Sequence, residues 1–147
     1  MKLVPYVHFS GNAEEALNLY AEVLGGKIEQ LGRYGESPMQ SDEDWKDKIL
    51  HARLVFDDNM IMISDSFKNN PVSTNGNIQL SVDVEDAEKL NKVFEKMSEG
   101  GKVSMPLQDT FWGARFGMLQ DKFGVNWMFN CQLPKQENDN KEEKDIR

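Results

Sequence analysis

Residues 4–28 read VPYVHFSGNAEEALNLYAEVLGGKI, an apolar stretch followed by a Gly-Asn turn and then by apolar residues at intervals of three and four. That spacing is typical of an amphipathic helix that buries one face, so we predict a strand and then a helix over residues 13–24. We expect Asn12 to cap this helix together with Glu15, and Gly25 to end it in a left-handed conformation.

The same pattern returns in residues 78–103, which read IQLSVDVEDAEKLNKVFEKMSEGGKV. Asp83 is the expected cap of the second helix, and Gly100-Gly101 is its expected end. Strand-like segments joined by turn-forming residues follow each copy. They are residues 27–33, 49–56 and 60–64 after the first copy, and residues 103–107, 114–119 and 125–131 after the second.

The duplication predicts an α+β fold of two βαβββ modules, at about residues 1–66 and 76–132. Each module leaves one sheet face without a helix, so we expect the two curved mixed sheets to pair and enclose a cleft. Together the modules form a single predicted domain over residues 1–133. Residues 134–147 are dense in charges of both signs, which predicts a disordered tail.

Composition narrows the classes of function. The chain has 147 residues with 25 acidic against 17 basic side chains, and its formal charge of −8 disfavours nucleic acid as a partner. Its longest apolar run, Met60 to Ile63, is far shorter than the ~20 residues that cross a bilayer, and its N-terminal residues do not resemble a secretory signal. Cys131 is the single cysteine, so we expect no internal disulfide and a reducing, cytoplasmic location.

Six motifs point to one family; they are FSGNAEEA at 9–16, HARL at 51–54, ISD at 63–65, GGKV at 100–103, TFWGARFG at 110–117 and DKFGVNW at 121–127. Together they resemble the PhnB-like family of the vicinal oxygen chelate superfamily, which includes glyoxalases, bleomycin-resistance proteins and ring-cleaving dioxygenases. The resemblance implies the glyoxalase/bleomycin-resistance fold and a homodimer. Some family members carry a ubiquinone-methyltransferase label, but this sequence lacks the glycine-rich strand-to-helix turn on which a methyl donor normally sits.

Metal-dependent members of the superfamily bind the ion through His or Glu side chains on the first and last strands of each module. The matching positions here are Pro5, Asn77, Met128 and one within residues 62–64, and none of them is His or Glu. Because Pro and Met do not replace an imidazole or a carboxylate around a hard or borderline divalent ion, we predict no catalytic metal and no other cofactor.

Strand alternation predicts which side chains line the cleft. The predicted cleft rows are Pro5, Val7 and Phe9; His51 and Arg53; Met60, Met62 and Ser64; Asn77, Gln79 and Ser81; and Asn126, Met128 and Asn130. The alternating residues, among them His8, Ile78 and Trp127, are expected to lie on the helix side. There His8 would be a hydrogen-bonded structural residue.

Methionine and amide side chains dominate these rows, and such walls adapt to varied ligands and orient them. Arginines would favour an anionic or carbonyl-bearing ligand, or alternatively pair with surface carboxylates. Trp112 either covers the cleft mouth or packs within its hairpin, and the acidic loop around Trp45 either orders against a second subunit or acts as a lid. The candidate ligand-binding residues are Arg53, Met62, Ser64, Asn77, Gln79, Trp112, Arg115, Asn126 and Met128.

Three functions remain open. One is a metal-free receptor that holds a small, anionic molecule without reacting, similar to the bleomycin-resistance branch. The second is a lyase-like or isomerase-like enzyme for a small carbonyl or enol substrate, with His51 as general base and Arg53 or Arg115 stabilising an oxyanion. The third is a purely structural dimer. Replacing His51 separates the first two, because an enzyme would lose turnover and a receptor only affinity.

Overall fold

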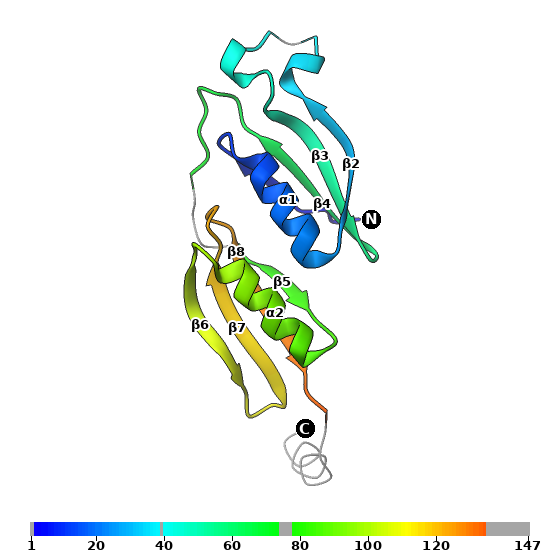
Figure 1. The fold of residues 1–147 in the computed structure, drawn as a ribbon, viewed down its shortest axis with the longest axis vertical. Helices are drawn as coiled ribbons and strands as arrows, with labels where there is room; N and C mark the ends of the chain where they lie inside the picture. The colour runs from blue at the N-terminus through cyan, green and yellow to red at the C-terminus, as the bar shows by residue number, and fades with distance from the viewer. Residues whose placement is uncertain (1, 39, 74–77, 135–147) are drawn as a thin grey trace. The chain divides into compact units, whose positions relative to one another are not determined.

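The duplicated sequence pattern folds into two units with the same order of strand, helix and three strands (Figure 1). The computed structural model describes residues 2–38, 40–73 and 78–134, and the two units divide between Ser73 and Thr74. The first unit contains β1 (Tyr6–Phe9), α1 (Ala13–Leu24), β2 (Lys27–Arg33), η1 (Tyr34–Glu36), η2 (Glu43–Trp45), β3 (Ile49–Phe56) and β4 (Asn59–Asp65). The second contains β5 (Leu80–Asp83), α2 (Ala87–Ser98), β6 (Lys102–Asp109), β7 (Ala114–Gln120) and β8 (Asn126–Gln132).

Each unit has a mixed four-stranded sheet, in the order β1-β4-β3-β2 or β5-β8-β7-β6. The first strand of each unit pairs in parallel with the last, and the remaining pairs are antiparallel. The predicted α+β fold of two βαβββ modules is therefore confirmed. The predicted tail, residues 134–147, lies outside the described residues except for Pro134.

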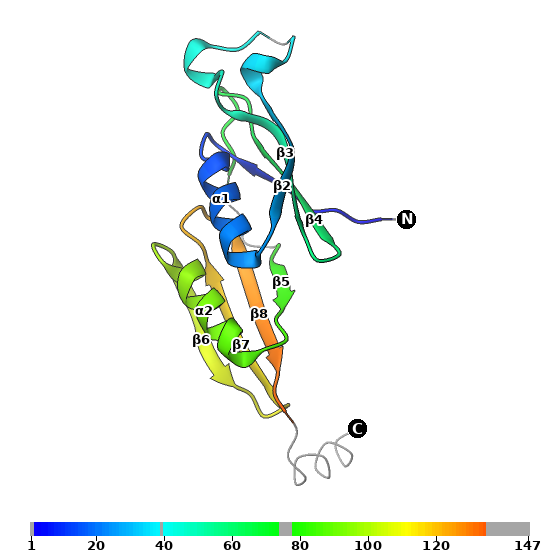
Figure 2. The same ribbon diagram turned by 45° about the vertical axis from the view of Figure 1, so that its right-hand side comes forward.

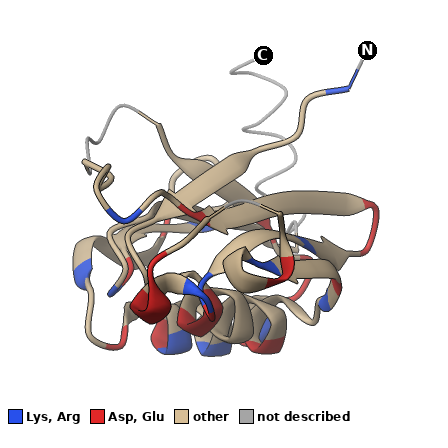
Figure 3. Cartoon of the chain, turned by 90° about the horizontal axis from the view of Figure 1, so that it is seen from above, with Lys and Arg blue, Asp and Glu red and all other residues tan. Residues whose placement is uncertain are grey.

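Each helix packs on one face of its own sheet, as Figures 1 and 2 show. The residues buried in this way include Leu17 and Tyr20 of α1, and Leu90 and Met97 of α2. Burying each such side chain stabilises the fold by about 1.5–3 kcal/mol. Charged residues gather on the helices and loops and are sparse on the strands (Figure 3). Among the described residues, neither helix is long and apolar enough to cross a membrane.

The helix ends differ in part from the predictions. Gly25 has the expected left-handed conformation, with φ of 70°. Asn12, however, makes no side-chain cap hydrogen bond, because the amides at the start of α1 are held by the Asp65 carboxylate of β4. Asp86, and not Asp83, caps α2 by accepting a hydrogen bond from the Lys89 amide at 3.0 Å. Asp83 is instead the last residue of β5.

Glu14 on the first turn of α1 gives stability a small pH dependence. Arg33 donates to it at 2.7 Å, and this hydrogen bond lowers the pKa of the Glu14 carboxyl below its usual value. A lowered folded pKa contributes stability above the unfolded pKa, and this contribution disappears as the pH falls through the folded value. Since the side chain of Glu14 is 49% exposed, solvent screening limits the effect to a few tenths of a kcal/mol, on the order of an exposed ion pair.

Glu14→Gln is therefore expected to reduce the loss of stability between about pH 5 and 3, the range in which such a carboxyl titrates. The measurement is the urea midpoint as a function of pH, and Glu15→Gln on the same helix turn is the matched control. If the urea midpoint falls equally with decreasing pH in Glu14→Gln and in the unchanged protein, the Glu14–Arg33 hydrogen bond does not contribute to the pH dependence.

Candidate functional site

The helix-free face of the first sheet, named here the open face, brings together most of the candidate residues of that unit. Met62 on β4 is the cross-strand neighbour of Arg53 on β3 and of Tyr6 on β1. His51 lies two residues before Arg53 and shares its face. Ile61 and Ile63 point to the other side and are buried with Ala52 and Leu54. The predicted faces of β3 and β4 are thus confirmed.

The face prediction for β1 is wrong by one residue. Val7 pairs with buried Ile63, and Phe9 is only 3% exposed, so Val7 and Phe9 lie on the helix side. His8 consequently lies on the open face with Tyr6. The prediction took its parity from Pro5, which precedes the strand, and a shift of one residue turns every side chain to the opposite face.

Two hydrogen bonds organise the aromatic side chains of the open face. The Tyr6 hydroxyl lies 3.1 Å from Nδ1 of His51, and Nδ1 of His8 lies 2.9 Å from Oγ of Ser64. The rings of Tyr6 and His8 stack with centroids 4.5 Å apart, whereas His51 meets Tyr6 edge-on at 5.8 Å. Sequence reasoning missed Tyr6 because the shifted parity placed it on the helix side.

Arg53 differs from the other described arginines in its partners. Arg33 pairs with Glu14 at 2.7 Å and Arg115 with Asp109 at 2.8 Å. No ion pair joins Arg53 to a carboxylate among the described residues, and its buried Nε atom has no hydrogen-bond partner there. An unsatisfied buried donor costs about 1–3 kcal/mol, and more when it is charged. The open face therefore contains a cationic group whose buried Nε–H has no acceptor among the described residues.

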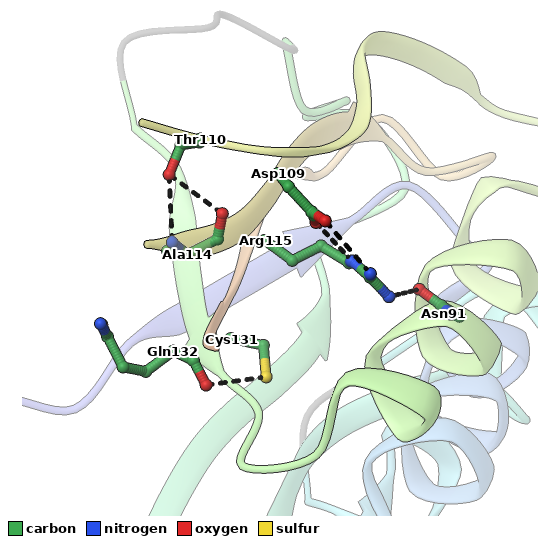
Figure 4. A network of polar contacts seen from close by, with 7 residues as sticks. All are labelled: Asn91, Asp109, Thr110, Ala114, Arg115, Cys131 and Gln132. Carbon is green, nitrogen blue, oxygen red and sulfur yellow. Dashed lines mark hydrogen bonds and ion pairs between the residues drawn. The ribbon is translucent and has the colours of Figure 1, made fainter. Parts of the chain in front are cut away.

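For Arg115 the alternative prediction is correct: the arginine pairs with a carboxylate of the same chain, Asp109. Its neighbour across the β7–β8 pair is buried Cys131, which places it on the α2 side of the second sheet. There it donates to Asp109 and to the Asn91 side chain of α2 (Figure 4). The prediction that Arg115 faces the cleft is wrong, because the alternation of β7 gives that face to Phe116 and Met118.

The helix-free face of the second sheet carries a row of methionines. Met128 on β8 pairs with Ser81 on β5 and with Met118 on β7, and Met118 pairs with Met105 on β6. Asn126 and Asn130 share this face, while Trp127, Phe129 and Cys131 are buried under α2, as predicted. Met105 and Met118 were missed, although the alternation around buried Leu119 would have placed Met118 here.

The remaining candidates have simpler surroundings. Asn77 lies outside the described residues. Gln79 is exposed and directly precedes β5, and Ile78 is exposed too, so the expectation that Ile78 packs on the helix side is wrong. Trp112 is 53% exposed in the β6–β7 turn and packs edge-on against Phe111. Its exposure contradicts the reading in which it is buried within the hairpin.

The acidic loop around Trp45 packs on its own unit. Trp45 donates its indole N–H to the Ser66 carbonyl, and its ring lies close to Gly11. Beside it is a hollow of about 620 Å³, lined by Tyr34, Gly35, Gln40, Ser41, Asp42, Trp45, Lys46, Phe67, Lys68 and Asn69. The two lysines of this lining pair with the neighbouring acids Asp42, Glu43 and Asp44, so the charges of the hollow are internally compensated.

The residues at the superfamily's metal-ligand positions do not fit a divalent ion. Pro5 has no side-chain donor and Met128 offers only a soft thioether. The two histidines of the open face each use Nδ1 in a hydrogen bond, His8 with Ser64 and His51 with Tyr6. Over residues 2–38, 40–73 and 78–134, no three His, Cys, Asp or Glu side chains are grouped to hold a metal.

The helix N-termini do not fit a nucleotide-like cofactor either. A glycine-rich turn binds such a cofactor through unpaired amides at the start of a helix. Here the amides of Gly11 and Ala13 donate to Asp65 at 2.8 and 3.0 Å. The carboxylate of Asp86 holds the corresponding end of α2. Each helix start is thus closed by the protein's own carboxylate.

Comparison with known proteins gives a consistent set of relatives. Residues 1–130 match the family model described as 3-demethylubiquinone-9 3-methyltransferase. The chain is 31% identical to Protein YjdN of Escherichia coli, covering 88% of this chain and 95% of that protein. Among solved structures it is similar to protein PA1353 from Pseudomonas aeruginosa, with 42% identity, a TM-score of 0.84, and coverage of 91% of this chain and 99% of that one.

A second solved structure carries the PhnB name, and a third relates the fold to a wider group. The former is a putative 3-demethylubiquinone-9 3-methyltransferase, PhnB protein, from Bacillus cereus, with 28% identity, a TM-score of 0.77, and coverage of 89% and 99%. The latter is a glyoxalase/bleomycin resistance/dioxygenase family enzyme from Burkholderia phytofirmans, with 16% identity, a TM-score of 0.58, and coverage of 87% and 97%. At that identity the likeness concerns the fold alone.

Proposed function

The chain belongs to the family described as 3-demethylubiquinone-9 3-methyltransferase, the PhnB-like group with the glyoxalase fold, and from this premise we propose that it binds a small organic anion on the open face of the first sheet. Arg53 is the anion-binding residue of this proposal. The observation that carries it is that Arg53 forms no ion pair among the described residues, although Glu29 is its cross-strand neighbour on β2, and that its buried Nε atom has no hydrogen-bond partner there.

The surroundings of Arg53 favour a small organic anion over an inorganic one. Met62 is its neighbour on β4 and presents a flexible, apolar side chain that adapts to a carbon skeleton. Tyr6, on the far side of Met62, and His51 offer polar atoms at the same face. A carboxylate suits the planar guanidinium because it accepts two parallel N–H bonds.

Methyl transfer is not part of this proposal, although the family description names it. A methyl donor normally sits on a glycine-rich strand-to-helix turn of a doubly wound sheet, whereas here Asp65 and Asp86 accept hydrogen bonds from the amides at the two helix starts. The donor set also does not fit a divalent ion, so no step of the proposed function depends on one. Ser64 remains a predicted contact in the first unit. Gln79, Trp112, Asn126 and Met128 belong to the second unit and remain sequence-based predictions outside this proposal, as does the homodimer.

Arg53→Met tests the proposal. We expect a panel of 2-oxo, 2-hydroxy, enol and aromatic carboxylates to include compounds that raise the melting temperature of the unchanged protein, because a ligand that binds the native state stabilises it. Isothermal titration then gives Kd values for the two proteins. Loss of a charge-assisted hydrogen bond costs about 1.5–3 kcal/mol, so affinity should fall about 10-fold to 100-fold in Arg53→Met.

Arg33→Met is the matched control, since it removes the same charge from an arginine that pairs with Glu14. Its affinity for the same anion should stay within about twofold of the original, in line with the small effect of an exposed pair. Equal losses in both variants would indicate a general charge effect, and unchanged affinity in Arg53→Met would refute the assignment of Arg53.

A further inference from the structure

We propose that Tyr6 and His51 form a proton-transfer pair that interconverts the keto and enol forms of a 2-oxo carboxylate. This inference rests on the proposed function, because Arg53 holds the carboxylate. Tyr6 is the new element, since its hydroxyl lies 3.1 Å from Nδ1 of His51 although 45 residues separate them in sequence.

The register of the first sheet explains how the two side chains meet. Tyr6 lies on β1 and His51 on β3, with β4 between them. Because Tyr6 pairs with Met62 and Met62 with Arg53, the phenol side chain crosses β4 to reach His51. The Tyr6–His51 pair and Arg53 therefore belong to one continuous patch of the open face.

His8 holds the Tyr6 ring in place from the same strand. Its imidazole stacks on the phenol at 4.5 Å with an interplanar angle of 15°, and Ser64 fixes the imidazole through a hydrogen bond of 2.9 Å. Ser64 is itself buried, so this contact is anchored in the sheet. His8 acts through Tyr6 and is a positioning residue.

The arrangement selects a substrate class. Arg53 provides a cation for a carboxylate, and the Tyr6–His51 pair provides a donor and an acceptor of protons on the same face. A 2-oxo carboxylate has a carbonyl oxygen that takes a proton and an acidic C3–H that releases one, both close to its carboxylate. A 2-hydroxy carboxylate has neither of these groups and would only bind.

The proton movements balance without any further reactant. Nε2 of His51 takes the C3 proton, and the C–H electron pair forms the C2–C3 double bond. The carbonyl π pair takes the proton of the Tyr6 hydroxyl, while Nδ1–H of His51 donates its proton to the Tyr6 oxygen. The products are the enol, a neutral Tyr6 and a His51 whose proton has moved from Nδ1 to Nε2, so the reverse sequence restores the starting state.

The test is exchange of the C3 protons of pyruvate with deuterium oxide, followed by proton NMR, alongside pyruvate binding measured separately. We expect the unchanged protein to accelerate exchange over a protein-free sample. Tyr6→Phe and His51→Gln should each lower the rate about 100-fold, the typical contribution of a positioned acid or base, with binding changed less than about threefold. Tyr34→Phe, which removes a buried hydroxyl that donates to the Asp65 carbonyl, is the matched control and should retain exchange.

His8→Gln gives a readout specific to positioning. It should lower the maximal exchange rate while the half-saturating pyruvate concentration and the number of pyruvate molecules bound per chain stay the same, whereas an unfolded fraction would lower the number bound. Lactate, tested as a competitor, should bind through Arg53 without exchange of its carbon-bound protons.

The outcomes separate the two proposals. Pyruvate binding that depends on Arg53 but brings no acceleration of exchange would overturn the proton-transfer pair and leave the anion site standing. Exchange that survives in Tyr6→Phe would overturn the role of Tyr6. Failure of pyruvate and of every other 2-oxo carboxylate to bind would overturn the pair, and failure of the whole anion panel would overturn the proposed function as well.

Discussion

Asp65→Ala is expected to destabilise the first unit by about 3–5 kcal/mol, the range of changes that break a buried polar network. The Asp65 side chain is 1% exposed, and its two carboxylate oxygens accept the backbone amides of Gly11, Ala13 and Ile49 at 2.8, 3.0 and 2.9 Å. Removing the carboxylate leaves three donors without their acceptor. The carboxylate also joins the start of α1 to the start of β3, so both elements lose their anchor.

Chemical denaturation followed by circular dichroism measures this change. Asp65→Asn retains one oxygen and should lose less stability than Asp65→Ala, while Asp58→Ala, in the exposed β3–β4 turn, should change it by less than about 0.5 kcal/mol. If Asp65→Ala shifts the denaturation midpoint no more than Asp58→Ala does, α1 does not depend on the hydrogen bonds of the Asp65 carboxylate.

Asp65 also illustrates why the cap of the first helix was predicted incorrectly, although its first residue, Ala13, was predicted correctly. Local sequence offers Asn12 as a cap, and residues at helix starts usually use a side chain of their own segment. In this chain the acceptor comes from β4, more than fifty residues later, so no local pattern reports it. The sequence did predict which faces of β3, β4 and β8 lie under a helix. In each of these strands every second residue is apolar, as Ile61 and Ile63 are in β4, and these side chains are buried.

The candidate site was predictable to a similar, partial degree. His51, Arg53 and Met62 were assigned to one face from strand alternation alone, since their apolar neighbours are unambiguous. Strand β1 is only four residues long. Val7 and Phe9 are apolar, but the rings of Tyr6 and His8 are partly apolar too, so alternation does not decide its face. For Arg115, the choice between a ligand and a carboxylate partner depended on Asp109, a contact across the β6–β7 hairpin that composition does not specify.

Gly101→Ala is expected to destabilise the second unit by about 2–4 kcal/mol, because overpacking against a backbone costs more than crowding a mobile side chain. A Cβ at Gly101 would lie 2.2 Å from the Gln120 carbonyl oxygen and 3.0 Å from two backbone atoms of Asp121. Gln120 is the last residue of β7, and Asp121 is the first residue of the β7–β8 turn. The added methyl group must therefore displace backbone and not a flexible side chain.

That displacement matters because Asp121 organises the turn. Its carboxylate accepts the amides of Phe123 and Val125 at 2.9 and 3.0 Å and the indole N–H of Trp127 at 2.9 Å. Gly32→Ala is the matched control, since nothing lies within 4 Å of a Cβ built there, and it should be nearly neutral. If Gly101→Ala and Gly32→Ala have the same denaturation midpoint, the close approach of Gly101 to the backbone of Gln120 and Asp121 is not the reason that glycine is needed at position 101.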